Sequence, residues 1–263
     1  MERKTIREGR NMLLRYPGSK TRVAKTLISL FPSFDEYREP FCGGASIFFN
    51  LKPKKAWLND VNVELVNLLV KIKDNVNDIL IEYDKYPKDQ SGLKALFNEI
   101  KYKAEFSPSE YYFINRTSFG GRTNHLPQRL SPSNVDQWQN SSIKKLTAAA
   151  VALKNTKITL GDYQPLIDAP ADNAFLLLDP PYYRNTELNN NDKLYFGNFT
   201  VEDHIRLANI LKTCKHKFLM TYDNHPFITD LYKDFNIMNF DFKYCLSPLK
   251  KKQIGRELII RNY

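Results

Sequence analysis

The feature that most constrains the fold is the apolar run Ala-Phe-Leu-Leu-Leu at residues 174–178, followed at once by Asp179, Pro180, Pro181 and Tyr182. Five consecutive apolar residues are typical of a strand that is buried on both faces of a parallel sheet. Neither a strand nor a helix can continue through the two prolines, because proline has no N–H to donate. An acid and an aromatic residue are therefore fixed at the strand tip. Because ligands of open α/β sheets bind at the carboxyl ends of the strands, the sequence predicts an α/β fold with a site at this tip.

An earlier stretch has the order of a nucleotide-type cofactor site. We expect residues 36–42 to form a short strand that runs into a Gly-Gly turn, and residues 45–51 to form a helix. A second strand at 55–59 ends in Asp60. Strand, glycine turn, helix, strand and acid, in this order, form the skeleton of such sites.

Acidic residues therefore follow three expected strands. Asp60 and Asp179 end the strands just described, and Asp162 follows a strand expected at 156–160. Because parallel strands end at the same sheet edge, we expect these three acids to lie close together. At the position of Asp60 an acid commonly accepts hydrogen bonds from ribose hydroxyls, and Asp162 is placed to bind an adenine amino group.

The long interval before the third strand indicates an insertion. Connections in such sheets are usually ~2–6 residues, or a dozen or more with a helix. We therefore expect residues 66–151 to be a mainly helical insertion, and residues 1–65 with 152–263 to form the domain that carries the strand-tip site.

Charge and composition indicate what kind of partner, metal content and location to expect. The net charge is +10, from 39 Lys and Arg against 29 Asp and Glu, which favours a polyanionic partner. The three cysteines are far apart and the four histidines lack ligand spacing, so we expect no metal. No apolar run approaches the ~20 residues of a membrane span, and the amino terminus lacks a signal peptide, so we expect a cytoplasmic protein.

Five motifs stand in a characteristic order. They are Arg-Tyr-Pro-Gly-Ser-Lys at 15–20, Glu-Pro-Phe-Cys-Gly-Gly at 39–44, Asn-Asp at 59–60, Asp162, and Asp-Pro-Pro-Tyr at 179–182. In this order the chain resembles the Dam-type DNA adenine-N6 methyltransferases, the alpha-group, D12-class enzymes with a DPPY motif, over nearly its full length. The resemblance implies a Rossmann-like S-adenosylmethionine-dependent methyltransferase sheet, with residues 66–151 as the target-recognition insertion.

The resemblance also implies a cofactor, S-adenosyl-L-methionine, which leaves as S-adenosyl-L-homocysteine, and no metal. Phe41 and the turn at residues 43–44 would form the floor, Asp60 would bind the ribose and Asp162 the adenine, while Tyr16 and Lys20 close over the methionine end. The full implied set is Tyr16, Lys20, Pro40, Phe41, Gly43, Gly44, Ser46, Asp60, Asp162 and Asp179.

The catalytic motif fits the chemistry of adenine N6, whose lone pair is delocalised into the ring. Asp179 and the carbonyl of Pro180 can accept the N6 hydrogens, and the rigid pair with Pro181 holds these acceptors still. Tyr182 offers a face on which the base stacks. Direct transfer then depends on alignment more than on proton transfer.

A base inside a duplex cannot reach such a pocket, so we expect double-stranded DNA as the substrate and base flipping. The resemblance implies that Arg116 holds a phosphate and that Phe119 wedges into the stack. Arg122, Asn124 and Arg129 would add phosphate or base contacts. Members that read GATC usually carry Asn where this chain has Gly120, so we expect either a recognition sequence other than GATC or weaker discrimination within it.

Other activities remain open at this point. Cytosine N4, adenine in RNA or a protein glutamine are alternative acceptors, although an Asp at the first motif position favours adenine. A DNA-binding module without catalysis is a further alternative, and it would not bind S-adenosylmethionine. A cognate restriction endonuclease is a candidate system partner, and a stand-alone enzyme is the alternative to it.

Overall fold

The computed structural model describes residues 12–16, 18–123, 129–183, 199–243 and 254–263. Within these residues a seven-stranded sheet has the order β3-β2-β1-β4-β5-β7-β6. The strands are β1 (Glu36–Glu39), β2 (Ala56–Asp60), β3 (Thr156–Leu160), β4 (Ala174–Leu178), β5 (Lys217–Asp223), β6 (Asn236–Lys243) and β7 (Ile254–Arg261).

Strands β1 to β5 pair in parallel, and β7 runs antiparallel to both β5 and β6. The α/β class is thus confirmed, with a Rossmann-like mixed sheet. The expected strand at 36–42 ends earlier, at Glu39, because Pro40 has no N–H to donate to a ladder. The carboxyl ends of β1 to β4 meet at one edge, which is where the candidate acids follow the strands.

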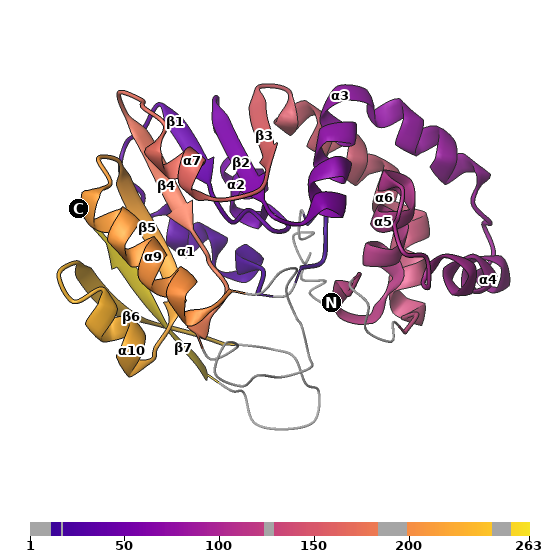
Figure 1. The fold of residues 1–263 in the computed structure, drawn as a ribbon. Coiled ribbons are helices and arrows are strands. Elements are labelled where there is room, and N and C mark those ends of the chain that lie inside the picture. Colours follow the sequence, from indigo (N-terminus) through magenta and orange to yellow (C-terminus); the bar gives the residue numbers. More distant parts are fainter. Residues whose placement is uncertain (1–11, 17, 124–128, 184–198, 244–253) are drawn as a thin grey trace, which may run out of the picture.

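Helices cover both faces of the sheet (Figure 1). On one face lie η1 (Lys20–Arg22), α1 (Ala24–Ile28) and α2 (Ser46–Leu51), and on the other α7 (Gln164–Asp168), α9 (Val201–Thr213) and α10 (Pro226–Leu231). Side chains of β4 alternate between two apolar cores: Phe175 and Leu177 belong to the first, and Leu176 and Leu178 to the second. Burial on both faces explains why this strand is a continuous apolar run.

Between β2 and β3 the chain forms a helical body beside the sheet (Figure 1). It contains α3 (Val63–Lys85), α4 (Gln90–Ile100), α5 (Pro108–Thr117), η2 (Phe119–Gly121) and α6 (Pro132–Leu153). Trp138 of α6 joins these helices, with ring centroids 5.0 Å from Tyr83 of α3 and 5.2 Å from Phe113 of α5. The boundaries expected at 65/66 and 151/152 fall inside α3 and α6, because both helices extend to the sheet. The division into two domains remains a proposal.

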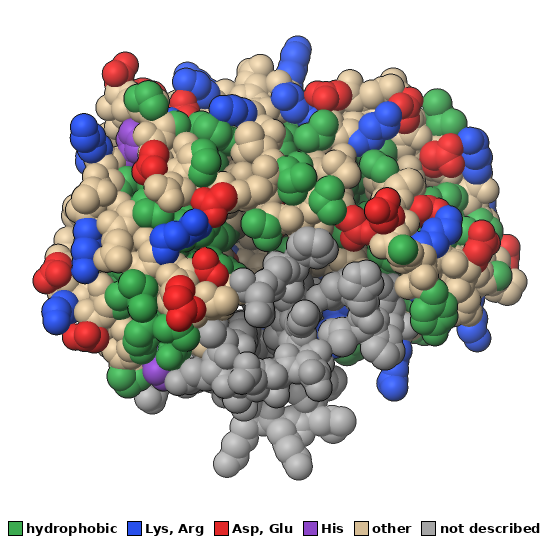
Figure 2. All heavy atoms as spheres, viewed as in Figure 1, with side chains coloured by type: hydrophobic (Ala, Val, Ile, Leu, Met, Phe, Trp, Pro, Cys, Tyr) green, Lys and Arg blue, Asp and Glu red, His purple; other side chains and the backbone are tan. Residues whose placement is uncertain are grey.

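Within the described part of the chain, no helix is both long and apolar enough to cross a membrane. On the face drawn in Figure 2, basic and acidic side chains of the described residues are interspersed. The excess of positive charge is therefore not gathered into one block on this face.

Candidate active site

A cavity of about 300 Å³ lies at the carboxyl ends of β1 to β4. Small-molecule sites commonly enclose ~300–1,000 Å³, so the cavity is large enough for a cofactor. Every residue that the resemblance assigned to the cofactor lines this cavity, and so do the four residues of the catalytic motif. These residues are Tyr16, Lys20, Pro40, Phe41, Gly43, Gly44, Ser46, Asp60, Asp162, Asp179, Pro180, Pro181 and Tyr182.

The glycine turn after β1 forms one wall together with Tyr16. Gly43 has a φ of +46°, and a Cβ built there would lie 3.0 Å from the Tyr16 ring. A Cβ on Gly44 would lie 3.0 Å from the Cβ of Tyr16. The two glycines thus let Tyr16 pack directly on the turn, and the backbone is left open to a ligand on the cavity side.

Asp60 braces the same turn. Its carboxylate accepts the N–H of Gly43 at 2.8 Å and the N–H of Asn62 at 3.0 Å. Burial raises the pKa of Asp60, and these backbone hydrogen bonds act in the opposite direction. Since each carboxylate oxygen has two lone pairs, Asp60 can still accept a hydrogen bond from a ribose hydroxyl.

Asn59 joins the loops that follow β1 and β3. Its side-chain amide donates to the carbonyls of Pro40 at 3.1 Å and Gly161 at 2.9 Å, and its oxygen accepts from Thr159 at 2.8 Å. The sequence marked Asn59 only as part of a motif. Its role is to hold two loops of the cavity at a fixed separation.

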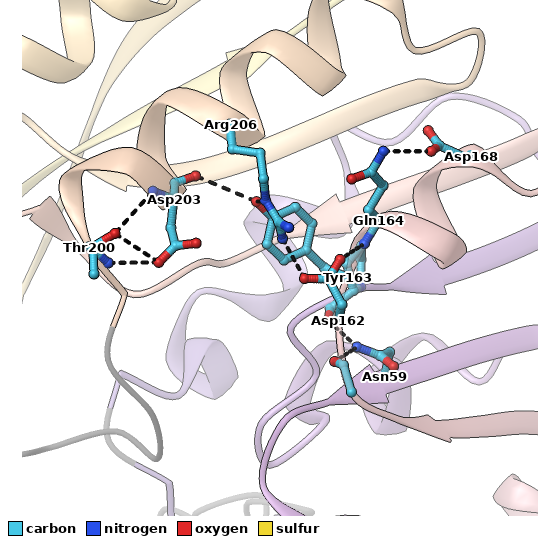
Figure 3. Close-up of polar contacts among 10 residues, drawn as sticks. Asn59, Asp162, Tyr163, Gln164, Asp168, Thr200, Asp203 and Arg206 are labelled. Atoms are coloured by element: carbon cyan, nitrogen blue, oxygen red, sulfur yellow. Dashed lines mark hydrogen bonds and ion pairs between the residues drawn. The ribbon is translucent and has the colours of Figure 1, made fainter.

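The far end of the cavity contains Asp162 and two residues that the sequence did not indicate, Tyr163 and Arg206 (Figure 3). The Arg206 guanidinium forms an ion pair with Asp162 and donates to the Tyr163 hydroxyl at 2.9 Å. The other Asp162 oxygen accepts the N–H of Gln164 at 2.8 Å. Asp162 is therefore held in one orientation at the cavity wall.

An aromatic group lies beside this carboxylate. The ring centroid of Phe41 is 4.9 Å from that of Tyr163 and 5.9 Å from that of Phe199. Flat apolar faces next to an acceptor suit a purine with an exocyclic amino group. One sequence signal could have located Arg206 at the cavity. Thr200 and Asp203 form a capping box that begins α9 at this edge of the sheet, and α9 carries Arg206.

The catalytic motif is held from several sides. The ammonium of Lys20 lies 2.9 Å from the Oδ1 of Asp179 and donates at 2.9 Å to the hydroxyl of Tyr182. The hydroxyl of Thr221, on β5, donates to the same carboxylate at 2.6 Å. Glu257 of β7 lies 3.8 Å from the Lys20 ammonium. Lys20, expected at the methionine end, thus also contacts the catalytic group, and Thr221 is a contact that the sequence did not predict.

Comparison with known proteins identifies the family. A model described as D12 class N6 adenine-specific DNA methyltransferase matches residues 16–131 and 129–245. The chain belongs to this family. It therefore has the fold and activity of an S-adenosylmethionine-dependent enzyme that methylates adenine N6 in DNA.

Several relatives of this D12-class enzyme are similar over most of its length. The type II methyltransferase M1.LlaDCHI of Lactococcus lactis subsp. cremoris is 27% identical over 275 residues, covering 95% of this chain and 94% of its own. A DNA adenine methylase of Vibrio cholerae serotype O1 is 23% identical over 214 residues, covering 78% and 77%. Among solved structures, a putative methyltransferase complexed with SAH has a TM-score of 0.37 at 12% identity over 94% of this chain and 53% of its own, which is too distant to support an argument.

The DNA-binding candidates of the D12-class enzyme differ in exposure. Phe119 is 71% exposed at the start of η2, Arg129 is exposed and Arg122 is half-buried. Asn124 lies outside the described residues. The exposed ring of Phe119 is compatible with the expected wedge, and its role remains a proposal.

Arg116 is placed differently from the expectation. Its side chain is only 2% exposed, within α5, so it cannot reach a DNA phosphate in this conformation. Burial lowers the pKa of Arg116, and burial together with Arg116 and Arg15 lowers the pKa of Lys145 to about 8. Residues 109 and 111–117 of α5 are all buried, so Arg116 has no exposed face of the helix to occupy.

Proposed function

We propose that the enzyme transfers the methyl group to an adenine that is flipped out of double-stranded DNA, with Asp179 as the residue that orients N6. The observation that supports this most directly is the placement of Asp179 at the tip of β4, where it lines the cavity and is held by Lys20 and Thr221. A carboxylate fixed before the base arrives needs no reorganisation during the reaction.

The residues present fit S-adenosylmethionine, because the Gly43–Gly44 backbone and three strand-tip acids share one cavity. The bound cofactor would supply an electrophilic methyl group. Asp60 would accept from the ribose, and Asp162, beside the aromatic group, would accept from the adenine amino group. Asp179 and the Pro180 carbonyl would accept the N6 hydrogens of the target, while Tyr182 stacks on its ring.

The test is methyl transfer from labelled S-adenosylmethionine to duplex DNA, followed by analysis of the modified nucleosides. We expect N6-methyladenine, and loss of transfer by orders of magnitude in Asp179→Asn with DNA binding largely retained. Asp172→Asn makes the same chemical change at an exposed residue before β4 and is the matched control. N4-methylcytosine, or near-normal turnover in Asp179→Asn, would overturn the assignment.

We also propose a recognition sequence other than GATC, or weaker discrimination within GATC. Gly120 stands where GATC readers of the resembling group carry Asn, and it offers no side chain for a base contact. Mapping N6-methyladenine in DNA from cells that express the protein would test this. Methylation confined to GATC and complete at GATC would contradict it.

A type II restriction–modification system is the proposed context, with a cognate restriction endonuclease as system partner and the cytoplasm, where such DNA lies, as the location. Its support is that the relative from Lactococcus lactis, named a type II methyltransferase, aligns over 94% of its own length. DNA methylated by this enzyme should resist a nuclease encoded beside it. Cleavage of fully methylated DNA by that nuclease would reject the pairing.

A further inference from the structure

A buried asparagine of the helical insertion is bonded to the segment that walls the cofactor cavity. Asn115, on α5, is fully buried. Its side-chain oxygen accepts the backbone N–H of Arg15 at 2.9 Å, and its nitrogen donates to the Arg15 carbonyl at 2.8 Å. The same nitrogen donates to the Gly121 carbonyl at 3.0 Å. One side chain therefore joins the Arg15 backbone to the end of η2.

Gly121 makes this junction close. Its φ is +73°, and a Cβ built there would lie 2.2 Å from the carbonyl oxygen of Arg15. Asn134 of α6 closes the junction from another side, because it donates to the Ser118 carbonyl at 2.7 Å and accepts from the Arg15 guanidinium. The backbone of Arg15 thus has little freedom to move relative to the insertion.

The residue after Arg15 belongs to the cofactor cavity. Tyr16 lines that cavity and packs on the glycine turn, where a Cβ on Gly43 would approach its ring to 3.0 Å. Arg15 and Tyr16 therefore form a two-residue bridge between η2, which carries the exposed Phe119, and the Gly43–Gly44 wall.

We propose that Asn115 and Gly121 are positioning residues for the cofactor: by fixing Arg15, the insertion sets where Tyr16 stands against the glycine turn. DNA bound at η2 then changes the affinity for S-adenosylmethionine through the same contacts, and the cofactor changes the affinity for DNA by the same factor. This inference rests on the proposed assignment of the cavity as the cofactor site.

Two neighbouring glycines provide a matched test. Gly120 and Gly121 have φ values of +71° and +73°, so alanine is strained to a similar degree at both. A Cβ on Gly120 meets nothing within 4 Å, whereas one on Gly121 meets Arg15. Calorimetric titration with S-adenosylmethionine in the absence of DNA should show a roughly tenfold higher Kd for Gly121→Ala, comparable to the loss of one hydrogen bond. Gly120→Ala should stay within about twofold of the parent protein.

The coupling is measured by repeating both titrations with saturating duplex DNA. The ratio of the Kd without DNA to the Kd with DNA should move toward one in Gly121→Ala relative to the parent protein, while Gly120→Ala is the control for the titration without DNA. Equal Kd values in the two variants, or an unchanged ratio in Gly121→Ala, would overturn the inference. A parent protein that binds no S-adenosylmethionine would instead overturn the proposed cofactor site.

If Gly121→Ala does not fold, Asn115→Ala replaces it. Its control is Leu93→Ala, on α4, which removes packing from the same helical body and no contact with Arg15. Thermal unfolding is recorded for both. We expect a raised cofactor Kd in Asn115→Ala only, and a similar rise in Leu93→Ala would show that general loss of packing is the cause.

Discussion

The ammonium of Lys20 lies 2.9 Å and 3.0 Å from the two oxygens of the Asp179 carboxylate. Lys20 also donates to Tyr182, so one cation orients both the proposed acceptor and the proposed stacking residue. Since Lys20 is almost fully buried, this geometry is maintained by packing as well as by charge. In the proposed mechanism these side chains are therefore aligned before the target base enters.

Thr221 is expected to matter for transfer but not for cofactor binding. Thr221→Val keeps the shape of the side chain and removes the hydrogen bond to Asp179, so kcat should fall about ten- to a hundredfold as the carboxylate loses alignment. Single-turnover kinetics and cofactor titration measure the two effects separately. Thr229→Val, on α10, is the control, and an equal loss there would refute a specific role for Thr221.

Arg206 is expected to support the adenine end of the cavity. Arg206→Ala removes the partner of Asp162 and should raise the Kd for S-adenosylmethionine about two- to fivefold, a modest effect because the ion pair is solvent-exposed. The same loss should appear with 5′-methylthioadenosine, which retains the adenine and lacks the amino acid. Lys212→Ala removes an exposed cation from the same helix and should change neither value. Unchanged binding of both ligands in Arg206→Ala would exclude this role.

Phe119 should act on base flipping without contributing to stability, because its ring is 71% exposed. In Phe119→Ala the fluorescence of a 2-aminopurine at the target position should fall more than the overall DNA affinity does. Tyr102→Ala is the matched control, because this aromatic side chain is 78% exposed elsewhere on the insertion. If both variants flip the base normally, Phe119 is not the wedge.

His204 should make the enzyme less stable in acid. It is fully buried, and burial lowers its pKa to about 4. The unfolded chain binds this proton near pH ~6.5 and the folded chain only near the lower value, so the free energy of unfolding falls as pH decreases between them. Glu39, whose pKa burial raises to about 8, contributes with the opposite sign. The measurement is therefore a difference between variants.

Urea unfolding at pH 7 and pH 5 provides that difference. The decrease in stability between these values should be smaller in His204→Phe than in the parent protein. His225→Asn also removes a histidine but keeps an acceptor at the amino-terminal cap of α10. It is the control for the removal of a histidine, and a pH response in His204→Phe identical to that of the parent protein would disprove the assignment.

Local sequence patterns predicted much of the structure at the edge of the sheet where the cavity lies. Strands β3 and β4 have the bounds expected from the sequence, because each is a short run of strand-forming residues with a turn or prolines after it. The Thr200 capping box likewise located the start of α9. Acids that follow such strands reach the cavity by topology alone, which explains why Asp60, Asp162 and Asp179 could be anticipated.

Contacts between residues far apart in the sequence could not be predicted from such local patterns. Thr221 and Arg206 lie on elements whose pattern indicates only burial and helix, and their partners are 42 and 44 residues away. The phosphate role of Arg116 came from the resemblance alone, and the sequence carried no sign that its side chain is buried, because a helix surrounded by protein has no polar face to distinguish. The hydrogen bonds of Asn115 could not be predicted either, because a side-chain amide that bonds to the backbone of two other segments produces no periodic pattern in the sequence.

Asp179 contacts Lys20, near the beginning of the chain, and Thr221 on β5, and Glu257 on β7 in turn contacts Lys20. Strand β7 also lies between β5 and β6, so without it β6 has no partner in the described sheet and β5 pairs only with β4. During synthesis the amino-terminal segments leave the ribosome first, and the contacts around Asp179 and Lys20 are incomplete until β7 has followed them. A nascent chain that ends before residue 254 should therefore leave the genome unmodified, and the order of translation itself delays the onset of methylation.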